Sequence, residues 1–339
     1  MNLLRGRTLT STGIVYVVLV AAIVVGAVMT TVLKDRNFFA GGNLTAILTF
    51  ASILGLVAIG QTLVILVGSL DLSVPYVISI ACVIGARQMD GQNDQILPAV
   101  LGALAICAAI GLVNGLVVSL LGVHGFIATL GMALILSGYI AARIEGDQGR
   151  VAPAFAKIDT AQIGPVPAEA VVMLACALLA VLLLRRTRLG HHMYAVGGNR
   201  EVARLSGIRT AIPVVAAHTL CSTLAGLAGL MLLSRVSVGK ASIGLTGNYD
   251  LMSIAAVVLG GTLLAGGKGN VTGTIGGVLI FAVMDQVMSV VGVPPFTQDV
   301  VRGLVIVLAV AVYARRELDR RPAPFDRPTG LDAALQEAR

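Results

Sequence analysis

Polar side chains within long apolar stretches are the residues of this sequence that could do chemistry. Asp71 is the lone charge of one such region, and Asp285 lies beside Gln286 in the middle of another. A carboxylate is costly inside a membrane, so it usually serves a function there, such as carrying a proton or lining a solute pathway. We expect a translocation pathway or gate to use polar groups of this kind, namely Gln61, Asp71, Ser73, Asn114 and Asp285.

A structural interpretation of the same residues stays open. Asp71 or Ser73 can accept hydrogen bonds from the free backbone N–H groups at the start of the next helix. Asp285 can hydrogen-bond to Ser or Thr neighbours. Asp299 and Arg302 are three residues apart, so they are expected to form an ion pair on one helix face.

Catalytic and metal-binding patterns are missing from the sequence. A phosphate-binding loop needs Gly-Lys followed by Ser or Thr, but Lys268 precedes Gly269 and Lys240 precedes Ala241. There is no His-Glu-x-x-His motif, and the four cysteines form no Cys-x-x-Cys or Cys/His cluster. We therefore predict that the chain is not an enzyme and binds no metal or cofactor.

The composition identifies the elements that must position these residues. The chain has 339 residues, of which 57% are hydrophobic and only 12% are charged. A soluble domain carries about 25% charged residues. Since a membrane span needs about 20 largely apolar residues, we predict an all-α polytopic membrane protein of about ten helices, some short or broken. The expected spans are 14–33, 44–67, 74–86, 97–121, 125–142, 168–184, 212–233, 250–266, 271–291 and 298–314.

The distribution of basic residues predicts the orientation of these spans. With ten spans, the side that holds both termini carries nearly twice as many lysines and arginines as the other side. Basic loops stay in the cytoplasm, so both termini, the loop 185–211 and the tail 315–339 are expected there. The rule also explains the net charge of +7 without a nucleic-acid partner. Residues 1–339 are predicted to form one transmembrane domain.

The loop 185–211 contains a short predicted helix. Asn199 suits its N-cap and Gly207 its C-terminal stop. Between them, Val202, Ala203 and Leu205 are apolar and could dock into a groove on a partner. The alternative is a solvated basic loop that only fixes the topology.

Four segments together resemble one family. Residues 60–73 (GQTLVILVGSLDLS), 126–131 (FIATLG), 194–208 (YAVGGNREVARLSGI) and 255–269 (AAVVLGGTLLAGGKG) occur in the order found in the ribose/xylose/galactoside-type ABC transporter permeases. The resemblance covers about residues 45 to 315. Four positions depart from the usual pattern: Ser69 and Pro75 replace glycines, Gly125 replaces Pro, and Val202 replaces Ala.

The resemblance implies a membrane subunit of a binding-protein-dependent importer for a small sugar or sugar-like solute, in a bacterial inner membrane. Its expected partners are a second permease copy or homologue, a solute-binding protein and a cytoplasmic ATPase that carries ATP-Mg. The segment that couples to the ATPase would be residues 197–208, with Gly197, Gly198, Asn199, Glu201, Val202, Ala203, Leu205, Ser206 and Gly207.

Three other classes of function compete with this one. Asp71 and Asp285 could carry protons in an ion-coupled secondary transporter, but that class leaves the docking loop unexplained. Related permeases for nucleosides or branched-chain amino acids share the superfamily. A membrane enzyme is disfavoured by the missing motifs.

Overall fold

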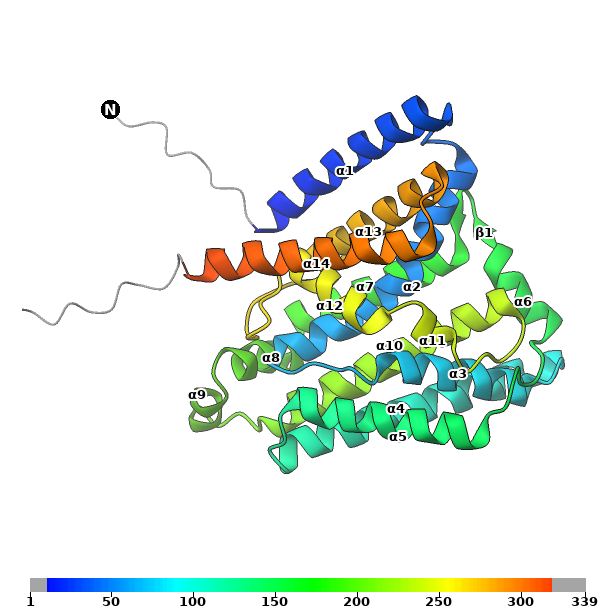
Figure 1. Cartoon of the computed structure of the whole chain (residues 1–339). Coiled ribbons are helices and arrows are strands. Elements are labelled where there is room, and N and C mark those ends of the chain that lie inside the picture. Colours follow the sequence, from blue (N-terminus) through cyan, green and yellow to red (C-terminus); the bar gives the residue numbers. More distant parts are fainter. Residues whose placement is uncertain (1–10, 319–339) are drawn as a thin grey trace, which may run out of the picture.

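The computed structural model describes residues 11–318 as a bundle of helices (Figure 1). Ten long or span-like helices make up the bundle: α1 (Ser11–Lys34), α2 (Gly41–Leu66), α3 (Val74–Met89), α4 (Ile96–Leu120), α5 (Gly125–Arg143), α7 (Ala168–Arg186), α10 (Ala211–Val236), α12 (Tyr249–Leu259), α13 (Val271–Val291) and α14 (Pro295–Leu318). The shorter elements are η1 (Asn93–Gln95), α6 (Pro153–Thr160), β1 (Gln162–Ile163), β2 (Val166–Pro167), α8 (Arg188–Gly198), α9 (Arg200–Leu205) and α11 (Ile243–Thr246).

Each predicted span has a helix in this part of the chain, which confirms an all-α polytopic membrane protein. Among the described residues, seven helices are long and apolar enough to cross a membrane, and α3 and α12 are shorter apolar helices. The span predicted over 250–266 was too long, because α12 ends at Leu259. Gly261 and Gly266 have φ angles of 89° and 88°, which turn the chain out of the helix.

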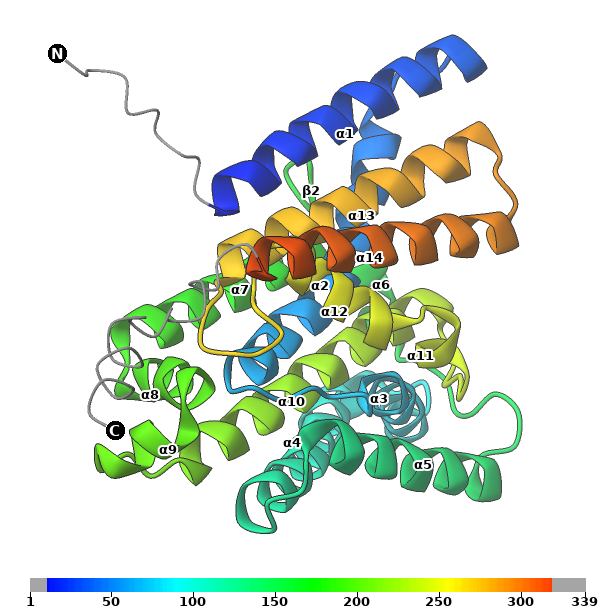
Figure 2. The same ribbon diagram turned by 60° about the vertical axis from the view of Figure 1, so that its left-hand side comes forward.

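Helix α2 lies at the centre of the bundle, buried along most of its length (Figure 2). It packs against α10, α13, α7 and α12, while α10 also packs against α4 and α3. Small residues allow close approach between α12 and α13. A Cβ on Gly277 would overlap the carbonyl oxygen of Ala256, as expected for a small-residue helix contact.

The polar stretch between α5 and α7 folds onto the end of α10. Arg235, near that end, pairs with Asp159 at 3.0 Å and with the buried carboxylate of Glu169 at 2.9 Å. The backbone N–H of Gln148 donates to the carbonyl of Gly239 at 2.9 Å. These contacts attach α6, the loop before it and the start of α7 to one end of the bundle, and β2 contacts α2 there.

The start of α1, the end of α14 and the pair α8–α9 lie at the opposite end (Figure 1). The first described helix therefore begins, and the last one ends, at the same end of the bundle. Residues 1–10 and most of the predicted 315–339 tail, from residue 319 on, lie outside the described residues.

We predict that this end faces the cytoplasm. A reporter that works only in the cytoplasm should be active when fused after Arg339 and inactive when inserted at Gly146, in the loop after α5. The reason is the excess of basic residues at the α8–α9 end. Activity of a periplasm-specific reporter after Arg339 would contradict this orientation.

Candidate functional site

The chain is not helical between α2 and α3, although it remains inside the bundle. Gly68 has a φ of 78°, and Asp71 is fully buried. Asp71 Oδ1 accepts hydrogen bonds from the Ser73 backbone N–H at 3.0 Å and from the Ser73 hydroxyl at 2.5 Å. Asp71 thus stabilises the residue directly before α3, whereas the Ser73 side chain caps no amide of that helix.

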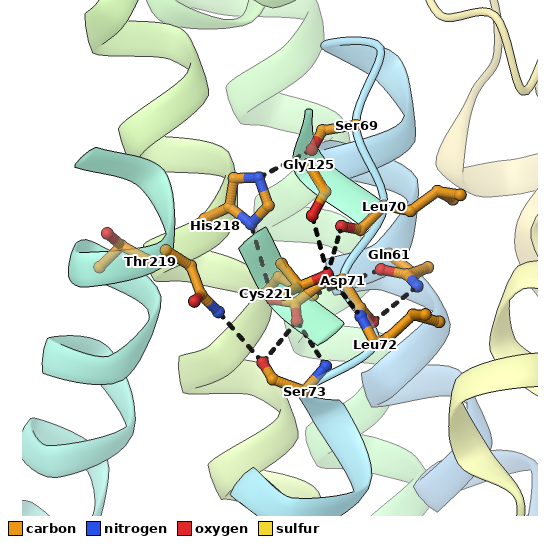
Figure 3. A network of polar contacts seen from close by, with 12 residues as sticks. Gln61, Ser69, Leu70, Asp71, Leu72, Ser73, Gly125, His218, Thr219 and Cys221 are labelled. Carbon is orange, nitrogen blue, oxygen red and sulfur yellow. Dashed lines mark hydrogen bonds and ion pairs between the residues drawn. The ribbon is translucent and has the colours of Figure 1, made fainter. Parts of the chain in front are cut away.

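Four of the five predicted pathway residues meet at this break, and Figure 3 labels three of them, Gln61, Asp71 and Ser73. Gln61 Nε2 donates to the carbonyl oxygen of Asp71 at 3.1 Å. Asn114 Nδ2, on α4, donates to the Ser73 hydroxyl at 3.1 Å. On α5, the Thr129 hydroxyl donates to the carbonyl of Leu70 and accepts the N–H of Leu72, both at 3.1 Å. Helices α2, α4 and α5 therefore all hold the break through hydrogen bonds.

His218 on α10 belongs to the same site and was not predicted. Its Nε2 lies 3.0 Å from the Ser69 hydroxyl, and its Nδ1 lies 3.6 Å from Asp71 Oδ2. An ionisable residue inside an apolar span is itself a signal of function, so the sequence did contain the clue. Ser69, His218 and Asp71 lie in the order of a hydrolase triad, but the 3.6 Å between His218 Nδ1 and Asp71 Oδ2 is too long for a hydrogen bond. All three are buried, so no substrate reaches the hydroxyl in this conformation.

We call the seven polar residues around the break the break cluster: Gln61, Ser69, Asp71, Ser73, Asn114, Thr129 and His218. Most of their polar groups are bonded within the chain, and among their fully buried side-chain atoms only Asp71 Oδ2 and His218 Nδ1 lack a hydrogen-bond partner. Non-helical backbone at membrane depth is tolerated only where protein or water satisfies it. In this conformation the cluster holds the non-helical segment in place through hydrogen bonds and does not line an open path.

Asp285 is not part of the break cluster. It pairs with Arg302, which links α13 to α14. The predicted pair of Asp299 and Arg302 is confirmed, with Asp299 Oδ1 at 2.8 Å from Nη1. The structure does not bring Asp285 together with the other predicted pathway residues.

The predicted short helix between α8 and α10 is confirmed as α9. The Asn199 side chain accepts the N–H groups of Glu201 and Val202, each at 3.0 Å. Gly207 ends the turn with a φ of 82°. Glu201 forms an exposed ion pair with Arg204 at 3.4 Å. The Ser206 hydroxyl donates to the Val202 carbonyl at 2.9 Å.

The apolar residues of α9 do not share one face. Val202 is 57% exposed and Leu205 is 78% exposed, as a docking surface requires. The prediction that Ala203 faces a partner is wrong, because it is only 4% exposed and packs into the core. Residues i and i+1 of a helix point in different directions, so Val202 and Ala203 cannot both face outward.

Gly197 and Gly198 end a helix, α8, where the sequence suggested a loop. A Cβ on Gly197 would overlap the Leu66 carbonyl oxygen and lie 2.6 Å from the amide nitrogen of Gly267. The Gly267 amide itself donates to that carbonyl at 3.0 Å. A Cβ on Gly266 would lie 2.9 Å from the Cα of Gly68 and 3.0 Å from the carbonyl oxygen of Gly197. We call these four glycines, Gly68, Gly197, Gly266 and Gly267, the glycine junction.

Tyr194 also connects α8 to the loop after α12. Its hydroxyl donates to the carbonyl of Gly269 at 2.9 Å. Burial raises the pKa of Tyr194, which keeps this donor protonated near neutral pH. The end of α2, the α8–α9 segment and the 260–269 loop thus meet at the glycine junction, at the start of the break.

Two of the residues that depart from the family pattern, Ser69 and Gly125, lie in contact. A Cβ on Gly125, at the start of α5, would overlap the Ser69 hydroxyl. Ser69 therefore fills the space that a residue larger than glycine at 125 would need. His124, just before α5, has a φ of −60° and a ψ of 132°, which is compatible with a proline at 125.

Replacing Gly125 with Pro should destabilise the chain by about 1–3 kcal/mol, because the ring would crowd Ser69. Adding Ser69→Gly should recover most of that loss, and the two changes should couple by about 1 kcal/mol or more. Thermal unfolding of the solubilised single and double variants measures this. Ser69→Gly alone is the control, and purely additive effects would disprove the compensation.

Comparisons with known proteins agree with this architecture. Residues 43–310 match a family model described as the permease component of a branched-chain amino acid transport system. The chain is 38% identical over 304 residues to the ribose import permease protein RbsC of Escherichia coli K12, covering 88% of this chain and 93% of that relative.

Two further relatives are also named as sugar import permeases. The galactose/methyl galactoside import permease protein MglC of Haemophilus influenzae is 31% identical, with 84% of this chain and 91% of that relative covered. RbsC of Bacillus subtilis is 33% identical, with 83% and 88% covered. No solved structure matches the chain.

Proposed function

Because the chain belongs to the family of permease components typified by branched-chain amino acid transport systems, we propose that it is the translocating subunit of an ATP-driven importer for a small sugar or sugar-like solute. It would lie in a bacterial inner membrane as a multi-pass protein. The relatives named for ribose and for galactose support a sugar.

The observation that carries the proposal is the physical path from α9 to the break. Val202 and Leu205 are exposed on α9. Helix α8, one residue before α9, contacts the end of α2 through Gly197 and Leu66. A force applied to α9 would therefore reach the backbone directly before the break cluster.

The partners follow from this role. A cytoplasmic ATPase would contact α9 and supply ATP-Mg, since the chain has no phosphate-binding loop. A solute-binding protein would deliver the solute at the opposite end, and a second permease copy or homologue would complete the pathway. The coupling residues would be those from Gly197 to Gly207, with the interface made by Val202 and Leu205. The chain itself would need no cofactor.

Uptake in cells tests the proposed solute class. Deleting the gene should remove uptake of one labelled pentose or hexose, with ribose and galactose tested first, and a plasmid copy should restore it. Normal sugar uptake in the deletion strain, with loss of nucleoside or branched-chain amino acid uptake instead, would favour the related permease class. Sugar uptake that is lost only when the proton gradient collapses, at a constant ATP level, would favour an ion-coupled carrier.

A further inference from the structure

An apolar groove of about 600 Å³ opens on the side of the bundle near the α8–α9 end. Its walls come from the ends of α4 and α7 and from the starts of α8 and α10. Thr219, its single polar lining residue, donates its hydroxyl to the carbonyl of Val215 at 2.9 Å and so offers no free donor. The walls include Leu116, Leu120, Leu183, Leu189, Ile212 and Ala216.

Five exposed arginines either lie within three residues of a groove-lining residue in the sequence or contact the neighbour of one, and we call them the arginine rim: Arg185, Arg186, Arg188, Arg200 and Arg209. Arg188 directly precedes the lining residue Leu189, and Arg209 comes two residues before Ala211. Arg200 Nη2 donates to the carbonyl of Ser119, next to Leu120. Within residues 11–318, none of the five has an acidic partner.

Two protein occupants fit this surface poorly. A symmetric contact with a second copy would place the same patch on both sides, so the arginine rim would face arginines. A soluble ATPase would have to reach along α10 to Leu220, about 13 Å from the start of the helix. A flexible hydrocarbon chain reaches that depth, and a negative headgroup matches the rim.

We propose that the groove binds one acyl chain of an anionic glycerophospholipid whose phosphate headgroup contacts the arginine rim. Basic pockets between membrane helices bind such headgroups, and each Lys or Arg near the surface contributes about 1 kcal/mol. This site lies beside the coupling segment but does not depend on which solute is carried.

The absence of Trp from the chain allows a site-specific test. A single reporter, Ile212→Trp, is placed in the groove at a residue that is 53% exposed. A control reporter, Leu134→Trp, is placed on the exposed side of α5, outside the groove, at a residue that is 67% exposed. Each is reconstituted in phosphatidylcholine bilayers with brominated phosphatidylglycerol or brominated phosphatidylcholine. Quenching gives the binding constant of phosphatidylglycerol relative to phosphatidylcholine at each reporter. This ratio should be about ten at the groove reporter and about one at the control reporter.

Removing charges from the arginine rim then tests whether these arginines cause the lipid preference. Arg188→Gln with Arg209→Gln should bring the preference close to one, while the matched pair Arg143→Gln with Arg150→Gln, exposed at the opposite end, should leave it unchanged. Equal quenching by both lipids at Ile212→Trp, or a preference that survives the loss of Arg188 and Arg209, would overturn the proposal. If Ile212→Trp does not fold, Leu120→Trp at the same groove replaces it, with the same two outcomes.

Discussion

Replacing Leu205 with Glu should prevent recovery of the ATPase with the permease while leaving the permease folded. Leu205 is 78% exposed on α9, so the change adds no charge to the core. At the centre of an interface, loss of an apolar anchor costs about 2–4 kcal/mol, which weakens binding by roughly 30-fold to 1,000-fold. Solute uptake should fall with assembly, and co-purification from membranes measures the first effect.

Neighbouring positions on α9 provide the controls. Arg204→Gln changes an exposed side chain of the same helix, 71% exposed, and should leave assembly within a few fold of normal. Ala203→Glu places a charge at a position that is 4% exposed, so it should lower the amount of folded permease instead. If ATPase recovery and uptake with Leu205→Glu equal those of the unchanged chain, α9 is only a solvated loop.

Replacing Gly197 with Ala should separate ATPase binding from transport. The added methyl group would overlap the Leu66 carbonyl oxygen and crowd Gly267, forcing α8 away from the end of α2. Val202 and Leu205 remain on the surface, so the ATPase should still bind. Transport should fall by more than about tenfold, because a misplacement of about 1 Å can cost such factors in a geometrically demanding site.

Gly198→Ala is the matched control for this change. A Cβ on Gly198 meets no atom within 4 Å, and Ala is a better helix former than Gly by about 1 kcal/mol. Transport per assembled complex, with ATP hydrolysis measured in the same sample, distinguishes the two variants. Equal transport by Gly197→Ala and Gly198→Ala would show that the glycine junction plays no part in coupling.

The spans were predictable because apolar length is a property of the sequence alone. All ten apolar stretches became helices, and the error at 250–266 arose where hydropathy continues through a glycine turn. Helix α8 was missed because Gly197 and Gly198 are poor helix formers. Its glycine at 197 is required by the contact with Leu66, which only the fold reveals.

Part of the site was predictable because a polar residue within an apolar stretch is also visible in the sequence alone. Gln61, Asp71, Ser73 and Asn114 stood out as polar residues in apolar surroundings, and the fold brings them together. Asp285 stood out equally but pairs with Arg302 elsewhere. The sequence could not show which polar residues meet, nor that Ala203 faces inward on a helix of 6 residues.

Uptake by proteoliposomes tests most directly whether the chain is the translocating subunit of an ATP-driven importer. The purified chain is reconstituted with its ATPase, the loaded binding protein outside and ATP-Mg at the face that carries α9. The account predicts accumulation of a labelled sugar that requires all three proteins and hydrolysable ATP, without any ion gradient. Accumulation by the chain alone, driven by a proton or sodium gradient and indifferent to ATP, would contradict it.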